Sequence, residues 1–268
     1  MKNLIHLVMD YAPGDLALAE VVSALSSHVS NNYHFHLTSI DSFDTVSTGF
    51  VTAQLARVPQ ENSNLIIYSN CAPRKDLKIA RENNEGEGLL YGYLTNGVAV
   101  FAVNSGYSLS FIKNDLHSLR KVNVSDAGSQ FRSRDNFPKA IGAYTAYLET
   151  GHIDSILGED LDPMKVIPDA PECAIGYVDS FGNLKTTIRD FDPILNNFTP
   201  GQRIGIEING VSMSATVTSG SFNVQEGDIA FSPGSSGGSK RYWEIFQRGG
   251  SAWHTYKKPR PGSSIIIK

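Results

Sequence analysis

The chain has 268 residues, of which 41% are hydrophobic and 19% charged, and its formal net charge is −4. These values are typical of a globular protein with one large or two modest domains. The near-neutral balance, without a basic run, argues against a nucleic-acid partner and suits a small-molecule ligand. The apolar run among the first residues is too short for a signal peptide, and no apolar stretch is long enough to cross a membrane. We therefore expect a cytoplasmic protein.

The first residues predict the beginning of an α/β domain. Residues 4–9 form an apolar run typical of a buried strand, and residues 16–29 place apolar side chains on one helical face. In α/β sheets, ligands gather at the carboxyl ends of strands, where Asp10 would lie. Asp15 is well placed to cap the helix. Capping explains Asp15 without a ligand, whereas a simple turn explains Asp10 less well.

The alternation of residues 34–37 places His34 and His36 on one face of the next strand. Two histidines without a third ligand are better interpreted as solvent-facing residues of an edge strand than as a metal pair. The two cysteines, Cys71 and Cys173, are far apart and form no CxxC pair, so neither a zinc site nor a disulfide framework is indicated. We predict no metal.

Further elements follow in a regular order. We expect a helix over 46–55, a strand over 64–69, a hairpin of 89–94 and 98–103, and a helix over 138–148. The Asn96-Gly97 pair between two apolar runs is a strong hairpin signal. Phe43 precedes the second helix, and core packing is its simplest interpretation.

The segment around residues 159–172 is rich in proline and acidic residues, which is typical of a linker. After it the chain changes to short strands and turns. We therefore predict an α/β domain over residues 1–160, a linker over 161–172, and a smaller all-β domain, a barrel, over 173–268.

Residues 176–188 read as two strands interrupted at Phe181-Gly182-Asn183. Asp179, Phe181 and Asn183 would project from this break as a carboxylate, an aromatic surface and an amide. An adenine ring needs an aromatic surface for stacking and an amide for its donor–acceptor edge. An ordinary hairpin with a Gly-Asn turn explains the same spacing equally well.

Residues 234–238, Gly-Ser-Ser-Gly-Gly, superficially resemble the nucleophile loop of chymotrypsin-like proteases. That reading requires a preceding β-barrel with a histidine and an aspartate, and the first half here reads as α/β. A phosphate-binding loop would lead into a helix, whereas residues 241–246 look like a strand. Neither alternative is supported by its context.

The break at residues 179–184, Asp-Ser-Phe-Gly-Asn-Leu, resembles a segment of the S-adenosylmethionine hydroxide adenosyltransferase family, which also contains the fluorinases and chlorinases. Other motifs follow in the family's order. Asp10 and Asp15 keep the spacing of two family aspartates, and residues 131–137 match the family's Phe-x-x-Arg-Asp-x-Phe pattern. The resemblance covers nearly the whole chain.

The resemblance implies roles for residues of the first domain. Asp10 would bind the ribose hydroxyls, Asp15 would lie near the methionine ammonium group, and Phe43 would form part of a wall beside the ribose. Here Tyr11-Ala12 replaces the family's Phe-Gly.

The resemblance also implies where the attacking nucleophile would be held. Asn70 stands where the hydrolases have a water-handling aspartate, and Arg74 or Lys75 is nearest to the family's arginine. Phe131 is shared, Arg132 replaces the hydrolase histidine, and Ser133 matches the fluorinase serine that contacts the halide. An asparagine could orient a water molecule but could not take its proton. Arg134 and Asp135 are best interpreted as a structural ion pair.

In the second domain the resemblance implies that Asp179, Phe181 and Asn183 hold adenine and part of the methionine. Ser239 matches a serine that contacts the methionine end, and Gly249 is the best candidate for a backbone contact to adenine.

The implied reaction is displacement at the 5′-carbon of S-adenosylmethionine by water, hydroxide or halide, giving adenosine or a halo-adenosine and L-methionine. The family forms homotrimers, in which the site lies between one subunit's N-terminal domain and the next subunit's C-terminal domain. The reaction uses no further cofactor. The alternative is a catalytically degenerate S-adenosylmethionine or adenosine binder, because Asn70 and Arg132 replace the hydrolase Asp and His.

Overall fold

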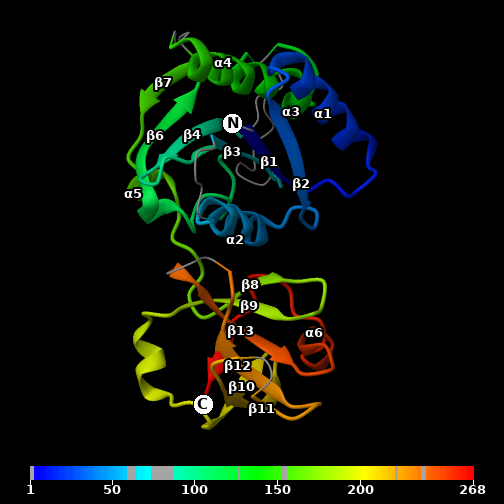
Figure 1. The fold of residues 1–268 in the computed structure, drawn as a ribbon, viewed down its shortest axis with the longest axis vertical. Coiled ribbons are helices and arrows are strands. Elements are labelled where there is room, and N and C mark those ends of the chain that lie inside the picture. Colours follow the sequence, from blue (N-terminus) through cyan, green and yellow to red (C-terminus); the bar gives the residue numbers. More distant parts are fainter. Residues whose placement is uncertain are drawn as a thin grey trace, which may run out of the picture. The chain divides into compact units, whose positions relative to one another are not determined.

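The computed structural model has mixed α/β content and two seven-stranded sheets. It describes residues 3–58, 64–73, 87–125, 127–151, 156–220, 223–236 and 240–268. The chain divides into two compact units: Met1–Thr52 with Gln60–Asp169, and Ala53–Pro59 with Ala170–Lys268. Figure 1 labels the elements of both units in chain order.

The first sheet consists of β1 (Asn3–Met9), β2 (Tyr33–Ser39), β3 (Leu65–Asn70), β4 (Leu89–Leu94), β5 (Ala99–Val103), β6 (Leu116–Val122) and β7 (Leu157–Asp160). Its strand order is β2-β1-β3-β5-β4-β6-β7. The neighbours β2, β1, β3 and β5 pair in parallel, and β4, β6 and β7 extend the sheet in antiparallel fashion. From β1 the chain goes to β2 on one side, and from β2 it crosses to β3 on the other. The topological switch point of the sheet therefore lies between β1 and β3.

The helical elements around this sheet are α1 (Leu16–His28), α2 (Thr45–Ala56), η1 (Lys113–Asp115), α3 (Arg132–Asp135), α4 (Phe137–Thr150) and α5 (Pro163–Val166). Helices α1, α3 and α4 lie together on one face of the sheet, and α2 lies on the opposite face (Figure 1). Strand β3 is buried along its whole length, as expected for a parallel strand covered on both faces.

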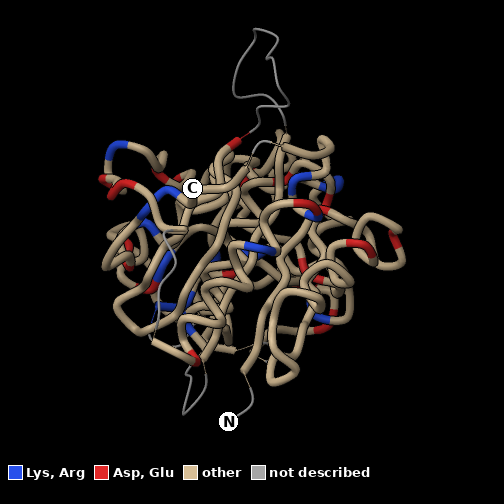
Figure 2. The backbone as a smooth tube through the Cα atoms, turned by 90° about the horizontal axis from the view of Figure 1, so that it is seen from above, with Lys and Arg blue, Asp and Glu red and all other residues tan. Residues whose placement is uncertain are grey.

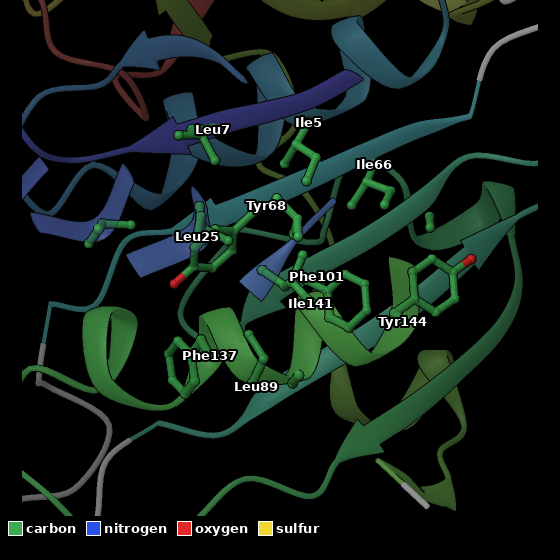
Figure 3. Packing of buried hydrophobic residues seen from close by; sticks show 14 of the residues in the cluster. Ile5, Leu7, Leu25, Ile66, Tyr68, Leu89, Phe101, Phe137, Ile141 and Tyr144 are labelled. Carbon is green, nitrogen blue, oxygen red and sulfur yellow. The ribbon is translucent and has the colours of Figure 1, made fainter. Parts of the chain in front are cut away.

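The core on the α1 and α4 face is drawn in Figure 3. Ile5 and Leu7 of β1 and Ile66 of β3 pack against Leu25 of α1 and Ile141 of α4. Each of these side chains is removed from water, and burial of apolar surface is the main favourable contribution to the folding of the unit.

Helix boundaries follow local sequence signals. The Asp15 side chain accepts a hydrogen bond from Ala17 N at 3.0 Å and caps α1, as predicted. Helix α4 has Pro138 in its first turn and is followed by the cap residue Gly151, whose φ of 74° is the left-handed value that favours glycine after a helix. The predicted helices, strands and hairpin of the first half are confirmed, with bounds shifted by one or two residues.

The second sheet consists of β8 (Ile175–Val178), β9 (Leu184–Arg189), β10 (Arg203–Ile208), β11 (Val211–Val217), β12 (Ile229–Pro233), β13 (Tyr242–Gln247) and β14 (Ile265–Ile267). Its strand order is β14-β10-β11-β12-β13-β9-β8. An isolated bridge between Ala174 and Ser264 links the two edges next to β8 and β14, so the sheet curls into a half-barrel. Two short helices accompany it, η2 (Pro193–Asn197) and α6 (Ala252–Thr255).

The inner face of the second sheet carries its own apolar core. Ile175, Ile206, Phe231 and Ile245 are fully buried in it, and the Tyr256 ring after α6 is fully buried as well. The second unit thus has a hydrophobic core separate from that of the first.

Residues 161–172 are not without structure, because α5 begins there with Asp162 as its cap, accepting from Met164 N at 3.0 Å. Asp169 accepts a 2.8 Å hydrogen bond from Lys113 Nζ, whose side chain is buried.

Along the described backbone, basic and acidic residues are interspersed without a long stretch of either sign (Figure 2). Among the described helices, none has the length and apolar character that a membrane span requires.

Candidate functional site

The residues that follow β1 and end β3 meet at the switch point of the first sheet. Met9 and Asn70 are paired in the parallel register, and Asp10 N donates to Asn70 O at 3.2 Å. The side chains of Asp10 and Asn70 therefore lie at the carboxyl edge of the sheet, where open α/β sheets bind ligands. The two candidate residues, 60 positions apart in sequence, are brought together.

The Asp10 carboxylate is oriented by the loop before α2. Its Oδ2 accepts a hydrogen bond from Phe43 N at 3.1 Å. Phe43 itself has a φ of 65°, and its side chain is 58% exposed. The interpretation of Phe43 as a core residue is therefore wrong. The Phe43 ring is exposed on a loop whose backbone N–H contacts Asp10.

Three polar side chains at this edge form a group that we call the hydroxyl cluster: Tyr11, Asn70 and Ser133. Asn70 Nδ2 donates to the Tyr11 hydroxyl at 3.1 Å, and the Tyr11 and Ser133 hydroxyls are 2.9 Å apart. Asn70 and Ser133 are both buried. The Tyr68 hydroxyl fixes the backbone of Ser133 by donating to its carbonyl oxygen at 3.1 Å. The cluster is thus positioned by strand β3 and by helix α3 together.

Phe131 and Arg132 lie beside the hydroxyl cluster. The Phe131 ring meets the Tyr11 ring edge-on, with centroids 6.1 Å apart. Arg132 Nη1 donates to Glu87 O at 3.2 Å, and its guanidinium carbon lies 5.3 Å from the centroid of the Phe137 ring. Because Glu87 precedes β4, which runs antiparallel to β5, Arg132 is held at the same edge of the sheet.

Arg134 and Asp135 form the structural ion pair that the sequence predicted. Arg134 Nε donates to Asp135 Oδ1 at 2.6 Å, and its Nη1 donates to Glu20 Oε2 at 2.5 Å. The hydrogen bond from Arg134 holds the pKa of the Asp135 carboxyl well below its usual range. These contacts tie α3 to α1, so they position Ser133 without contacting it.

Two residues at this edge of the sheet, Cys71 and Ser105, were not predicted as site residues from the sequence. The Cys71 side chain is buried, and the Ser105 hydroxyl donates to its carbonyl oxygen. Burial raises the pKa of the Cys71 thiol, and the negative charge of Asp10 adds to that effect. A lone cysteine and a lone serine carry no spacing signal, so only their positions after the parallel strands β3 and β5 could have indicated them.

The break at Asp179–Asn183 is a hairpin loop between β8 and β9. Asp179 Oδ1 accepts from Phe181 N at 3.0 Å and from Asn183 N at 2.9 Å, and its Oδ2 accepts from Asn183 Nδ2 at 2.9 Å. Lys185 Nζ lies 3.4 Å from Asp179 Oδ2. The Phe181 side chain is 78% exposed. The loop therefore presents an aromatic ring to solvent and an amide of which one N–H is used internally.

The segment after β13 lies against this loop. Trp253 N donates to Gly182 O at 2.9 Å, and a Cβ at Gly182 would overlap Ser251 Oγ. Gly182 has a φ of 78° and Gly249, two residues before Ser251, has a φ of 70°. The structure thus brings Ser251 and Trp253, which follow the Gly249 turn, against the Asp179–Asn183 loop.

The remaining candidates are accounted for as follows. Asp15 is exposed and serves as the cap of α1. Arg74, its neighbour Lys75, and Ser239 lie outside the described residues. His34 and His36 are exposed on β2, the edge strand, as expected. Over the ranges that the structure describes, no group of three or more histidine, cysteine or acidic side chains could hold a metal ion.

Comparison with known proteins identifies structures of the same fold but assigns no function. Neither a family model nor a curated protein sequence matches the chain. The structure is similar to that of an uncharacterized conserved protein from Thermotoga maritima, with 15% identity and a TM-score of 0.76, covering 98% of this chain and 100% of that one. It is also similar to a conserved hypothetical protein from Thermus thermophilus, with 16% identity and a TM-score of 0.67, covering 98% of this chain and 99% of that one. At these identities the similarity shows a common fold.

Proposed function

We propose that the protein binds S-adenosylmethionine and catalyses displacement at its 5′-carbon by water, hydroxide or halide. The products are adenosine or a halo-adenosine and L-methionine. The observation that carries this proposal is the meeting of Asp10, Asn70 and Ser133 at the switch point of the first sheet. By the family resemblance, Asp10 matches the ribose-binding aspartate, Ser133 matches the fluorinase serine, and Asn70 replaces the water-handling aspartate of the hydrolases.

The geometry around Asp10 supports ribose binding. A carboxylate is an acceptor for hydroxyl groups such as those of a ribose, and the hydrogen bond from Phe43 N to Asp10 Oδ2 helps to orient it. The exposed Phe43 ring beside it offers apolar surface to the sugar. Both features come from loops at the carboxyl edge of the sheet, where open α/β sheets bind ligands.

The Asp179–Asn183 loop supports binding of adenine. Phe181 offers a solvent-facing ring for stacking, and Asn183 keeps its carbonyl oxygen and one N–H for the base edge. Asp179 contributes by rigidity, because its carboxylate orders the loop through three hydrogen bonds. Following the family resemblance, we propose a homotrimer in which this loop and Asp10 of a neighbouring subunit hold one ligand.

The reaction asks little acid–base chemistry of the protein, since the sulfonium makes methionine a good leaving group. Alignment of the nucleophile and removal of its water are the main requirements. The buried Ser133 hydroxyl and the Asn70 amide suit the holding of a small nucleophile.

The finer division of the chain belongs to the same proposal: an α/β domain, a linker and a β-barrel domain, in a cytoplasmic protein.

A second function is favoured by one observation. The groups of the hydroxyl cluster are an amide and two hydroxyls, none of which is a base near neutral pH. A protein that binds S-adenosylmethionine or adenosine without turnover would keep the same ligand contacts.

The test combines product analysis with binding. Purified protein is incubated with S-adenosylmethionine, with and without chloride, and adenosine, halo-adenosine and methionine are quantified. An active member of the adenosyltransferase family is assayed in parallel as the positive control. If the protein binds S-adenosylmethionine but forms no product while the control does, binding without turnover replaces the enzymatic function.

Calorimetry with S-adenosylmethionine tests the site itself. We expect Asp10→Ala and Asn183→Ala each to weaken binding by about tenfold or more, the loss typical of hydrogen bonds involving charged or buried groups. The matched controls are Asp160→Ala and Asn196→Ala, two exposed positions that belong neither to the group around Asp10 nor to the Asp179–Asn183 loop. Unchanged affinity in the two site variants would remove the assignment.

A further inference from the structure

A lysine of the second sheet links the Asp179–Asn183 loop to strand β13. Lys185 of β9 is paired across the sheet with Glu244 of β13. Its neighbour Leu184 is fully buried in the core of the second unit, so the Lys185 side chain extends from the opposite face of the strand. There its Nζ donates to Glu244 Oε2 and lies 3.4 Å from Asp179 Oδ2. We call Asp179, Lys185 and Glu244 the Lys185 group.

The Lys185 group is mostly removed from water. The side chains of Asp179, Lys185 and Glu244 are 19%, 22% and 15% exposed. Within the part of the chain that the structure describes, Lys185 is the one basic side chain that contacts both carboxylates. Charges in partly buried positions are screened less than charges on the surface. Without the ammonium group, the two carboxylates would therefore repel each other.

The Asp179 carboxylate is the centre of the loop. Its Oδ1 accepts hydrogen bonds from the backbone N–H groups of Phe181 and Asn183. Its Oδ2, the oxygen nearest to Lys185, accepts from the Asn183 side-chain amide. A displacement of this carboxylate would break all three hydrogen bonds together. A loop that is disordered in the free protein must be ordered when a ligand binds, which lowers the affinity.

We propose that Lys185 is a positioning residue for the Asp179–Asn183 loop. Its ammonium group neutralises Glu244 and so keeps the Asp179 carboxylate in place, which holds the Phe181 ring and the Asn183 amide in one arrangement before a ligand binds. The inference rests on the proposed binding of adenine by this loop and adds the residue that preorganises it. The family resemblance implied no role for Lys185 or Glu244.

Hydrogen exchange in the ligand-free protein measures the order of the loop. The reporters are the amides of Phe181 and Asn183, both bound to Asp179 Oδ1. We expect Lys185→Met, which keeps a side chain of similar length without the charge, to accelerate the exchange of both amides about tenfold, the effect of losing one hydrogen bond to a charged group. In Lys185→Met/Glu244→Gln the repulsion is removed as well. Exchange should then return to within about threefold of the wild-type rate.

Calorimetry with adenosine connects the order of the loop to binding. We expect Lys185→Met to weaken adenosine binding by about tenfold, and Lys185→Met/Glu244→Gln to restore the affinity to within about threefold of the wild type. Urea unfolding of the same variants is measured in parallel. A lysine that served stability alone would lower the unfolding midpoint without changing the affinity of the folded protein.

The matched control is Lys268→Met, which removes the ammonium group of another lysine–glutamate pair in the second unit. Lys268 Nζ donates to Glu207 Oε2 at 2.6 Å and belongs to no contact of Asp179. This variant should leave the exchange of the Phe181 and Asn183 amides and the adenosine affinity at their wild-type values. Lys185→Arg keeps the positive charge and should stay within about threefold of the wild type in both measurements.

Three results would overturn the inference. The first is wild-type exchange of the Phe181 and Asn183 amides in Lys185→Met. The second is a double variant as impaired as the single one, because the charge of Glu244 would then not be the reason that Lys185 is needed. The third is faster exchange with unchanged adenosine affinity. Should Lys185→Met fail to fold by circular dichroism, Lys185→Gln takes its place with the same expectations.

The same measurements keep the two proposals apart. If the wild type binds neither adenosine nor S-adenosylmethionine, the proposed function fails and this inference fails with it. If adenosine binds and neither the exchange rates nor the affinity respond to Lys185, the proposed function stands and only the positioning role is lost.

Discussion

Gly182 lies directly against Ser251, so that a Cβ at position 182 would overlap the Ser251 hydroxyl. This contact joins the Asp179–Asn183 loop to the segment that follows β13, two regions about 70 positions apart. Gly182 also has a φ of 78°, which side chains other than glycine rarely adopt. The position is therefore closed to any other residue for two independent reasons.

We predict that Gly182→Ala destabilises the protein by about 2–4 kcal/mol, the sum of left-handed backbone strain and overpacking. The matched control is Gly201→Ala, where φ is 90° but no atom lies within 4 Å of the new Cβ. That variant should lose only about 1–2 kcal/mol from the backbone strain. Urea unfolding of both variants measures the difference. Equal losses would mean that the contact with Ser251 is unimportant.

Exposure of Phe181 leads to a prediction that separates stability from binding. Because its ring is 78% exposed, Phe181→Ala should change the unfolding free energy by less than about 0.5 kcal/mol. If the ring stacks on adenine, adenosine affinity should fall roughly ten- to hundredfold, as base–aromatic stacking contributes about 1–3 kcal/mol. Calorimetry measures the affinity.

The control for Phe181 is Phe191→Ala, another exposed phenylalanine of the second unit, at 65%. It should leave adenosine affinity unchanged. Equal affinities in the two variants would exclude Phe181 from the adenine site.

Tyr33 provides a prediction about pH. Burial raises its pKa to about 12, and within the described residues its hydroxyl has no hydrogen-bond partner. A pKa that is higher in the folded protein stabilises the fold while the phenol is protonated in both states. This contribution is present below about pH 10, the pKa of the unfolded side chain, and is lost as pH rises toward 12.

Tyr33→Phe should therefore make the unfolding free energy less sensitive to pH between about 10 and 12. At neutral pH the variant should be as stable as the wild type or more stable by up to about 1 kcal/mol, because a buried unpaired hydroxyl is removed. Denaturant titrations at several pH values measure both effects. A constant difference between wild type and variant across this range would contradict the prediction.

Local sequence signals predicted much of the fold. Asp15 indicated the start of α1, and Asn96-Gly97 indicated the hairpin of β4 and β5. Strand order could not be predicted, because it depends on packing between segments that are far apart in sequence. Helix α3 could not be predicted either, since four residues are too few for a helical period to appear.

The site was predicted in part, and the missing part has a physical reason. Asp10 could be assigned to the strand edge from its position after an apolar run. The contact between Tyr11 and Ser133 spans 122 positions and depends on how α3 docks on the sheet. Phe43 was interpreted as a core residue, but its side chain is 58% exposed on a loop in which its φ is 65°. Side-chain type alone does not determine this orientation.

The Cys71 thiol offers a direct report on the Asp10 region. It is buried and its pKa is raised, first by burial and then by the charge of Asp10, so little thiolate forms at neutral pH. We predict that in a Cys173→Ser background the native protein reacts slowly with a thiol reagent, because labelling requires local opening around Cys71.

Adenosine bound at Asp10 should slow this labelling. A ligand that binds only the closed form lowers the population of the open form by the factor 1 + [L]/Kd, so the rate should fall about tenfold at an adenosine concentration near ten times Kd. The rate is followed by mass spectrometry, with Asp10→Ala as the control in which protection should be lost. If adenosine binds by calorimetry but leaves the labelling rate of the wild type unchanged, the nucleoside does not bind next to Cys71, and Asp10 is not its ribose contact.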